Sequence, residues 1–206
     1  MSDPKRFHGE AVKRIGRYLL ATKDKGLIIQ PNHNNGFQCY VDADYCGNWD
    51  NKIAADYPST AQSQKSFIVK YVGVPLYWMS KLQTQYALST AESEYIGLSA
   101  AARYVKGTVY LMKEIKKTFD PNVHTLPNIH CCMLEDNSMA LEMSRTAKMR
   151  PCTCHLNVAF HHFCSEVAQG ILRIEPIDTK QQQADMVTKP VNLTTLVRLR
   201  KLIMGW

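Results

Sequence analysis

The sequence lacks any long apolar run. No stretch of its 206 residues approaches about eighteen consecutive apolar side chains, and residues 1 to 8 carry none of the apolar character of a secretion signal. These absences argue against a membrane-spanning helix and against export. We therefore expect an intracellular protein with no membrane partner.

Regular cysteine spacing is also missing. The chain has seven cysteines, an odd number, at irregular intervals. In a chain without an export signal, such cysteines are expected to be reduced thiols rather than a disulfide framework. The alternative is a zinc site, for which the candidates are Cys152, Cys154, His155, His161, His162 and Cys164. This set lacks the paired spacing of structural zinc modules, so we favour core cysteines beside a polar helix face.

The composition is that of a globular protein. Hydrophobic residues make up 45% and charged residues 21% of the chain, which allows one ordinary domain plus an appendage. Lysine and arginine exceed aspartate and glutamate by 25 to 18, a formal net charge of +7. A basic surface favours a polyanionic partner such as nucleic acid.

Hydrophobic periodicity predicts an N-terminal amphipathic helix at residues 5 to 22, which has a basic face. We expect this helix to pack on the adjoining domain. Nine further elements are predicted after it. The expected order is strand, strand, strand, helix, strand, helix, helix, strand, helix. It favours an α/β architecture, a mixed sheet flanked by helices. We expect strands at 37 to 44, 67 to 71, 74 to 79, 129 to 134 and 171 to 177, and helices from 89, at 138 to 145, at 156 to 167 and from 192. A helical segment at 1 to 35, a main domain at 36 to 191 and a C-terminal helix at 192 to 206 are the predicted divisions.

Four acidic residues lie beyond strand ends or at helix starts, where sheets of this kind bind their ligands. Asp42 ends the alternating strand at 37 to 44, Glu94 opens a long helix, Asp136 follows another strand, and Asp185 begins a late helix. Carboxylates held close together stay ionised only if cations neutralise them. Oxygen-rich sites select Mg²⁺ or Mn²⁺, and two such ions about 3.5 to 4 Å apart support phosphodiester hydrolysis.

Helix geometry chooses between two neighbouring glutamates. Glu92 and Glu94 lie about 200 degrees apart around a helix, so both cannot face the sheet. Ser89 and Glu92 fit a capping box, whereas Glu94 aligns with the apolar stripe of Leu98 and Val105. We therefore choose Glu94 as the metal ligand.

Four motifs resemble the ribonuclease H domain of copia-type LTR retrotransposon Pol polyproteins. They are Tyr-Val-Asp-Ala-Asp-Tyr at 40 to 45, Leu-Ser-Thr-Ala-Glu-Ser-Glu-Tyr-Ile at 88 to 96, Glu-Asp-Asn at 135 to 137 and Gln-Ala-Asp-Met-Val-Thr-Lys-Pro at 183 to 190. Residues 8 to 19 are similar to the connection segment that precedes this domain, so residues 1 to 35 are interpreted as connection-like. The resemblance implies a ribonuclease-H-like fold and cleavage of the RNA strand of an RNA:DNA hybrid. It also implies two divalent ions held by Asp42, Glu94, Asp136 and Asp185.

The resemblance carries expectations about partners and location. The partners would be an RNA:DNA hybrid, recognised by its groove shape and 2′-hydroxyls, and the remainder of the reverse transcriptase polyprotein. Localisation would be cytoplasmic. Lys148, Arg150 and Lys180 are candidates for phosphate contacts, with ordinary surface charge as the alternative for each.

The chain also departs from the family pattern. Thr153-Cys154-His155 stands where the family often has Thr-Lys-His, and residues 62 to 67 replace an arginine-rich stretch. Residues 178 to 183 contain no histidine, so a catalytic-loop histidine is not available. Polymerase, protease and integrase motifs are absent as well. The alternative function is therefore a catalytically degenerate polyprotein fragment that acts as a nucleic-acid-binding or assembly module.

Overall fold

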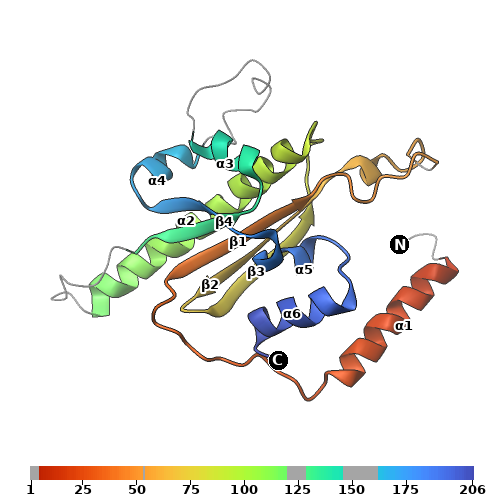
Figure 1. Ribbon diagram of the computed structural model, residues 1–206, viewed down its shortest axis with the longest axis horizontal. Helices are drawn as coiled ribbons and strands as arrows, with labels where there is room; N and C mark the ends of the chain where they lie inside the picture. Colours follow the sequence, from red (N-terminus) through yellow and green to blue (C-terminus); the bar gives the residue numbers. More distant parts are fainter. Residues whose placement is uncertain (1–4, 53, 120–128, 146–161) are drawn as a thin grey trace.

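A computed structural model describes residues 5–52, 54–119, 129–145 and 162–206 of the protein. Figure 1 shows a central sheet with helices on both faces and one helix that stands apart from it. No helix in the described residues is both long and apolar enough to cross a membrane.

The sheet has five strands in the order β3-β2-β1-β4-β5. β1 pairs antiparallel with β2, which pairs antiparallel with β3, while β4 runs parallel to both β1 and β5. The strands are β1 (Phe37–Asp44), β2 (Gln64–Tyr71), β3 (Val74–Leu82), β4 (Cys131–Glu135) and β5 (Leu172–Pro176). The expected ribonuclease-H-like mixed sheet is confirmed.

β1 lies at the centre of this sheet, and its residues are buried on both faces. The alternation in its sequence therefore does not separate a core face from a solvent face. β2 begins at Gln64, three residues before the predicted start. The reason is backbone pairing of residues 64 to 66 with 80 to 82 of β3, which requires no apolar side chain.

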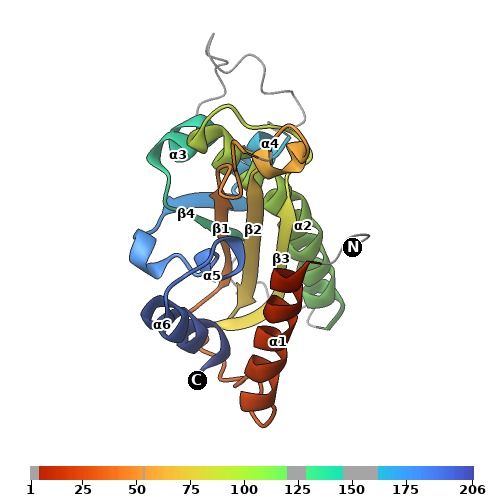
Figure 2. The same cartoon turned by 90° about the vertical axis from the view of Figure 1, so that its right-hand side faces the viewer.

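Helices cover the sheet on two sides (Figures 1 and 2). The long helix α2 (Thr90–Phe119) packs on one face, where it buries Leu98 and Val105 against Cys39, Val41 and other core residues. Two helices, α5 (Asp185–Thr188) and α6 (Leu193–Met204), cover the opposite face. The short helices are α3 (Ser138–Arg145), α4 (Cys164–Ala168) and the 3₁₀ turns η1 (Pro58–Ala61) and η4 (Thr179–Gln181).

The first helix, α1 (Arg6–Ala21), is confirmed as a helix but not as a packed one. None of its residues is buried, and Val12, Ile15 and Leu19 of its apolar stripe are exposed. The helix expected at 156 to 167 falls partly outside the described residues, and α4 covers only its last part and one residue beyond. Elsewhere the predicted order of elements is confirmed.

The C-terminal helix is joined closely to the rest of the protein. The Asn192 side chain caps α6 by accepting a hydrogen bond from the Thr195 N–H at 2.9 Å. Leu199 and Ile203 are buried, and the Trp206 indole N–H donates to the Gly26 carbonyl at 2.7 Å. The division at 35 and 191 stays a prediction, although residues of all three segments contact one another.

Candidate metal centre

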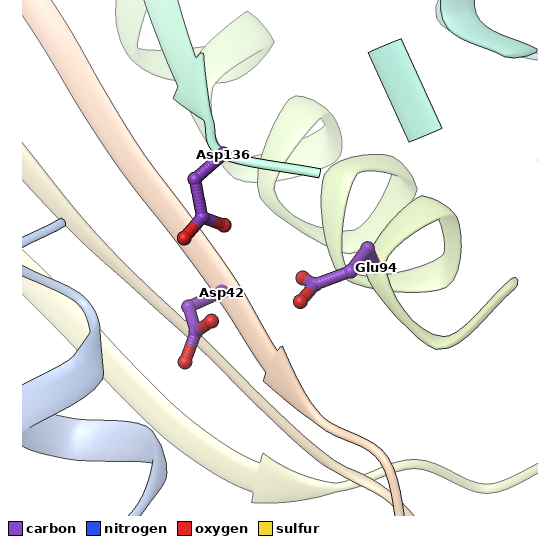
Figure 3. A group of neighbouring side chains, drawn as sticks. All are labelled: Asp42, Glu94 and Asp136. Carbon is purple, nitrogen blue, oxygen red and sulfur yellow. The ribbon is translucent and has the colours of Figure 1, made fainter. Parts of the chain in front are cut away.

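Three of the four predicted acids meet at one edge of the sheet. One carboxylate oxygen from each of Asp42, Glu94 and Asp136 lies within 4.8 Å of the others. Figure 3 shows the three side chains lying close together, with those of Glu94 at the start of α2 and Asp136 after β4 extending toward Asp42 on β1. Because β1 and β4 run parallel, their carboxyl ends reach the same edge, as expected of a ligand site in such a sheet.

The start of α2 is fixed by its capping residues. Ser89 Oγ accepts a hydrogen bond from the Glu92 N–H at 3.2 Å, and Glu92 Oε2 accepts one from the Leu88 N–H at 2.8 Å. Glu92 is thus engaged with the backbone of the preceding turn, and Glu94 turns toward the cluster. Gly97 lies against Val41, since a Cβ there would be 3.5 Å from Val41 Cγ1.

A glutamine side chain bonds to both β1 and β4 just beyond the point where the pairing of these two strands ends. Pairing between the two strands extends to Tyr40 and Leu134. The fully buried Gln182 donates through Nε2 to the Val41 carbonyl at 2.8 Å and more distantly to the Leu134 carbonyl at 3.4 Å. This contact holds the segment before α5 against the two strand ends and so places Asp185 near Asp42.

The buried carboxyl groups of the cluster have too few hydrogen-bond partners and positive charges around them. Asp42 is 1% exposed and Glu94 is 4% exposed, and Asp42 Oδ2 and Glu94 Oε2 have no hydrogen-bond partner among the described residues. Burial raises the pKa of Asp42 to about 6, with Asp185 and Asp136 adding to the rise and Lys189 opposing it. Burial also raises the pKa of Glu94 well above its usual range, and the nearby Glu135, Asp42 and Asp136 raise it further. This donor set fits a divalent cation, which would neutralise the acids and take up the unpartnered oxygens.

Asp185 is linked to Asp42 by ion pairs that both residues form with one lysine. It is 8% exposed at the first position of α5, and Lys189 Nζ lies 2.8 Å from its Oδ1 and 3.5 Å from Asp42 Oδ1. Ser66, which pairs with Asp42 across the strands, donates to the Ala184 carbonyl at 3.1 Å and holds α5 on β2. The structure therefore places Asp185 beside Asp42, outside the group of three, with an ammonium between them.

Sequence reasoning missed two charged residues at this edge. Glu135 is fully buried, its Oε1 accepts from the Asn137 N–H at 3.0 Å, and after burial it is the next cause of the raised pKa of Glu94. The alternation of β4 offered a signal, because it places Glu135 on the same buried face as Met133. Lys189 lies inside a motif quoted for the resemblance, but nothing in the local sequence indicates its contact with Asp42.

The remaining candidates fall elsewhere. Lys180 is exposed on η4 and is not part of the group of three carboxylates, while Lys148 and Arg150 lie outside the described residues. Of the proposed zinc ligands, only His162 and Cys164 are described. Every described cysteine has a free thiol, as at Cys39 and Cys131 in the core.

Comparisons with known proteins relate nearly the whole chain to polyproteins of plant transposons. It is 28% identical over 94% of its length to the retrovirus-related Pol polyprotein from transposon RE1 of Arabidopsis thaliana. It is 30% identical over 93% of its length to that from transposon TNT 1-94 of Nicotiana tabacum. The chain spans 12% and 13% of these two polyproteins. A secreted RxLR effector protein of Plasmopara viticola is 33% identical over half of the chain and 66% of its own length. No protein-family model matches the chain.

Solved structures with some similarity include ribonucleases H. The N-terminal RNase H domain of Rv2228c from Mycobacterium tuberculosis aligns with a TM-score of 0.47 and 13% identity, over 81% of this chain and 97% of that one. LC11-RNase H1 in complex with an RNA/DNA hybrid aligns with a TM-score of 0.44 and 13% identity, over 73% and 92%.

The order and directions of the strands define a ribonuclease-H-like fold, with carboxylates beyond the carboxyl ends of β1 and β4. The fold follows from this chain's own sheet. The sequence similarity then gives the particular relationship: the chain is homologous to one segment of copia-type, retrovirus-related Pol polyproteins.

Proposed function

We propose that this protein hydrolyses the RNA strand of RNA:DNA hybrids with divalent metal ions, as the ribonuclease H part of a retrotransposon polyprotein. The observation that carries the proposal is the meeting of Asp42, Glu94 and Asp136 within 4.8 Å, in a fold of the ribonuclease-H-like class. The homology to Pol polyproteins supplies the biological context. A cytoplasmic site of action and association with the rest of the reverse transcriptase belong to the same proposal.

The residues of the cluster would hold two Mg²⁺ or Mn²⁺ ions. When bound, such ions generate the attacking hydroxide from water and stabilise the leaving oxygen. Asp42, Glu94 and Asp136 would hold the ions, and Asp185, which lies beside Asp42, would be a further ligand. Glu94 keeps a proton in the metal-free protein because of burial and neighbouring charge, so metal binding would release protons.

Lys189 has a separate part in this arrangement. Its ammonium already forms ion pairs with Asp42 at 3.5 Å and with Asp185 at 2.8 Å. Its side chain is 35% exposed, so it has room to swing outward when a divalent ion takes its place. Asp185 would become a ligand only after that movement.

The test is cleavage of a labelled RNA:DNA hybrid by the purified protein with Mg²⁺ or Mn²⁺. Duplex DNA and double-stranded RNA serve as substrate controls, and Asp136→Asn serves as the protein control. We expect cutting of the RNA strand in the hybrid alone, and none by the variant. Equal cutting by Asp136→Asn would contradict the assignment of the site.

A second function has one observation in its favour. The ion pairs of Lys189 satisfy part of the acidic cluster without any metal, as a site without catalytic turnover would require. In that case the protein would act as a nucleic-acid-binding or assembly module. It would bind the hybrid equally well with and without Asp136→Asn, and neither form would cut it.

A further inference from the structure

A polar cavity of about 750 Å³ lies on the other half of the sheet face that carries Asp42. Its walls come from the loop before β1, the first half of β1, the connection from β5 to α5, and α6. Three cations, Lys70, Lys180 and Arg198, line it, and its lining includes no carboxylate. The other polar lining groups are mainly amides, such as Gln183.

Lys70 is the unusual member of this lining. It lies in β2 between β1 and β3 and is only 5% exposed, in a position where an apolar side chain is the rule. Its ammonium donates to Gln183 Oε1 at 3.2 Å and to the Leu202 carbonyl at 3.0 Å, and lies 5.9 Å from the ring centre of Tyr40. All these partners are neutral. Burial without a counter-charge lowers the pKa of Lys70.

The other two cations are free to contact a ligand. Lys180 and Arg198 are exposed at the rim, and neither forms an ion pair within the described part of the chain. Asp178 is the neighbouring acid, and its Oδ1 accepts a hydrogen bond from the Lys180 backbone N–H at 2.7 Å. The cavity thus holds one buried and two exposed positive charges together with amide groups.

We propose that this cavity binds a phosphate group, with Lys70 at its base and Lys180 and Arg198 at its rim. Phosphate offers the charge and the several acceptor oxygens that three cations and neighbouring amides would satisfy. The cavity adjoins the metal centre, because Tyr40 of its lining precedes Asp42 by two strand residues, or about 7 Å, but its lining includes none of the four acids of that centre. The phosphate would come either from a nucleic-acid backbone or from a free phosphate or nucleotide.

A structural role for Lys70 is the competing explanation. A cation that donates to Leu202 in the last turn of α6 interacts favourably with the helix dipole. That explanation accounts for Lys70 alone. It assigns nothing to Lys180 and Arg198, and it predicts no response to phosphate.

The first experiment measures binding of inorganic phosphate to the full chain by calorimetry and by thermal unfolding. Chelator is present, so the metal centre takes no part, and sodium chloride of equal ionic strength is the reference. We expect phosphate to raise the unfolding temperature of the wild type. In the double variant Lys180→Ala/Arg198→Ala, affinity should fall by about tenfold or more, because charged hydrogen bonds are lost.

The matched control is Lys117→Ala/Lys201→Ala, which removes two exposed positive charges outside the cavity. It should bind phosphate like the wild type. No response of the wild type beyond that to chloride would overturn the proposal, as would equal weakening in both double variants.

The source of the phosphate is tested with an RNA:DNA hybrid at several salt concentrations. If the backbone occupies the cavity, the cavity variant should bind the hybrid more weakly and lose about 2 from the slope of log affinity against log salt. If hybrid binding is unchanged while inorganic phosphate binding falls, a free phosphate or nucleotide is the ligand. Since neither assay uses divalent ions or cleavage, the result stands whether or not the protein is a ribonuclease.

Discussion

One face of β1 carries two opposite arrangements of buried charge. At the carboxyl end, Asp42 belongs to a group of acids whose negative charge is only partly neutralised by Lys189. Nearer the amino end, Gln38 pairs across the strands with Lys70, which is buried with neutral partners. Neither arrangement is needed to close a hydrophobic core, which lies mainly on the α2 side of the sheet. The comparison indicates that each end is built for an external ion of opposite sign.

The two ends differ in what compensates them. The acidic end contains its own cation, Lys189, with an exposed path to solvent. The basic end has no internal anion among its lining residues. We therefore expect ligand binding at the acidic end to compete with a protein group, and ligand binding at the basic end to proceed without such competition.

The largest expected effect comes from Glu94→Gln, which removes a ligand from the acidic end. Hybrid cleavage should fall at least about a thousandfold, because divalent ions would no longer be held for hydrolysis. Unfolding of the metal-free protein should not occur at lower temperature, since Glu94 is already protonated there and glutamine has nearly the same size and no charge. Cleavage rates and melting curves measure both effects.

Two glutamates of the same helix are the controls. Glu114→Gln changes an exposed residue, and Glu92→Gln keeps an oxygen that can accept the Leu88 hydrogen bond. Both variants should remain active. Loss of activity in Glu92→Gln with full activity in Glu94→Gln would reverse the assignment.

The next effect concerns pH. The folded pKa of Asp42 is raised to about 6 from 3.8, so the folded state binds a proton more tightly than the unfolded state. Stability of the metal-free protein should therefore fall as pH rises from about 4 to about 6, by roughly 3 kcal/mol at this residue. Glu94 extends the loss to higher pH.

Melting temperatures across this pH range test the sign. The fall should be smaller in Asp42→Asn, and Mg²⁺ or Mn²⁺ should stabilise the wild type more at pH 7.5 than at pH 5. A fall in melting temperature of the metal-free wild type that is no larger than the fall in Asp42→Asn would contradict the raised pKa of Asp42.

A smaller effect is expected from Lys189→Met, which removes the internal cation. Divalent ions should bind about tenfold more tightly, because they no longer displace an ammonium from Asp42 and Asp185. Calorimetric titration with Mn²⁺ measures this affinity, and Lys201→Met, an exposed lysine of α6, is the control. Weaker binding in Lys189→Met would show that the lysine supports metal binding rather than competing with it.

The smallest effect is expected from Lys70→Met at the basic end. Loss of two hydrogen bonds to neutral oxygens is offset by relief of a buried charge, so the free energy of unfolding should change by less than about 1 kcal/mol. The stabilisation by phosphate should nevertheless disappear. Chemical denaturation with and without phosphate separates the two quantities. A large loss of stability with an intact phosphate response would favour the structural role.

Local patterns were sufficient for most of the elements. The alternation around Asp42, the capping box at Ser89 and Glu92, and the cap at Asn192 each involve residues close in sequence, and the structure has these elements where they were expected. The choice of Glu94 rested on helix geometry and on the capping role of Glu92, both of which are local. It identified the glutamate that the structure brings to Asp42 and Asp136.

Other features depend on contacts that local patterns do not contain. Lys189 and Asp42 are 147 residues apart in sequence, and their approach depends on Gln182 and Ser66 holding α5 to the sheet. Lys70 lies inside a mainly apolar run, and its role requires α6 to cover it. The exposed α1 shows the reverse case, because an amphipathic pattern does not specify which surface it contacts.

The central claim is that Asp42, Glu94 and Asp136 form a divalent-metal site. Its most direct test is the anomalous scattering of Mn²⁺ in crystals of the protein grown without nucleic acid. We predict an anomalous peak about 2 to 2.3 Å from oxygens of these three carboxylates. Where a second peak lies next to Asp185, we predict that the Lys189 side chain has moved away from Asp185 and Asp42. Crystals with Mn²⁺ bound elsewhere, and with the three carboxylates free of metal at saturating concentration, would contradict the account.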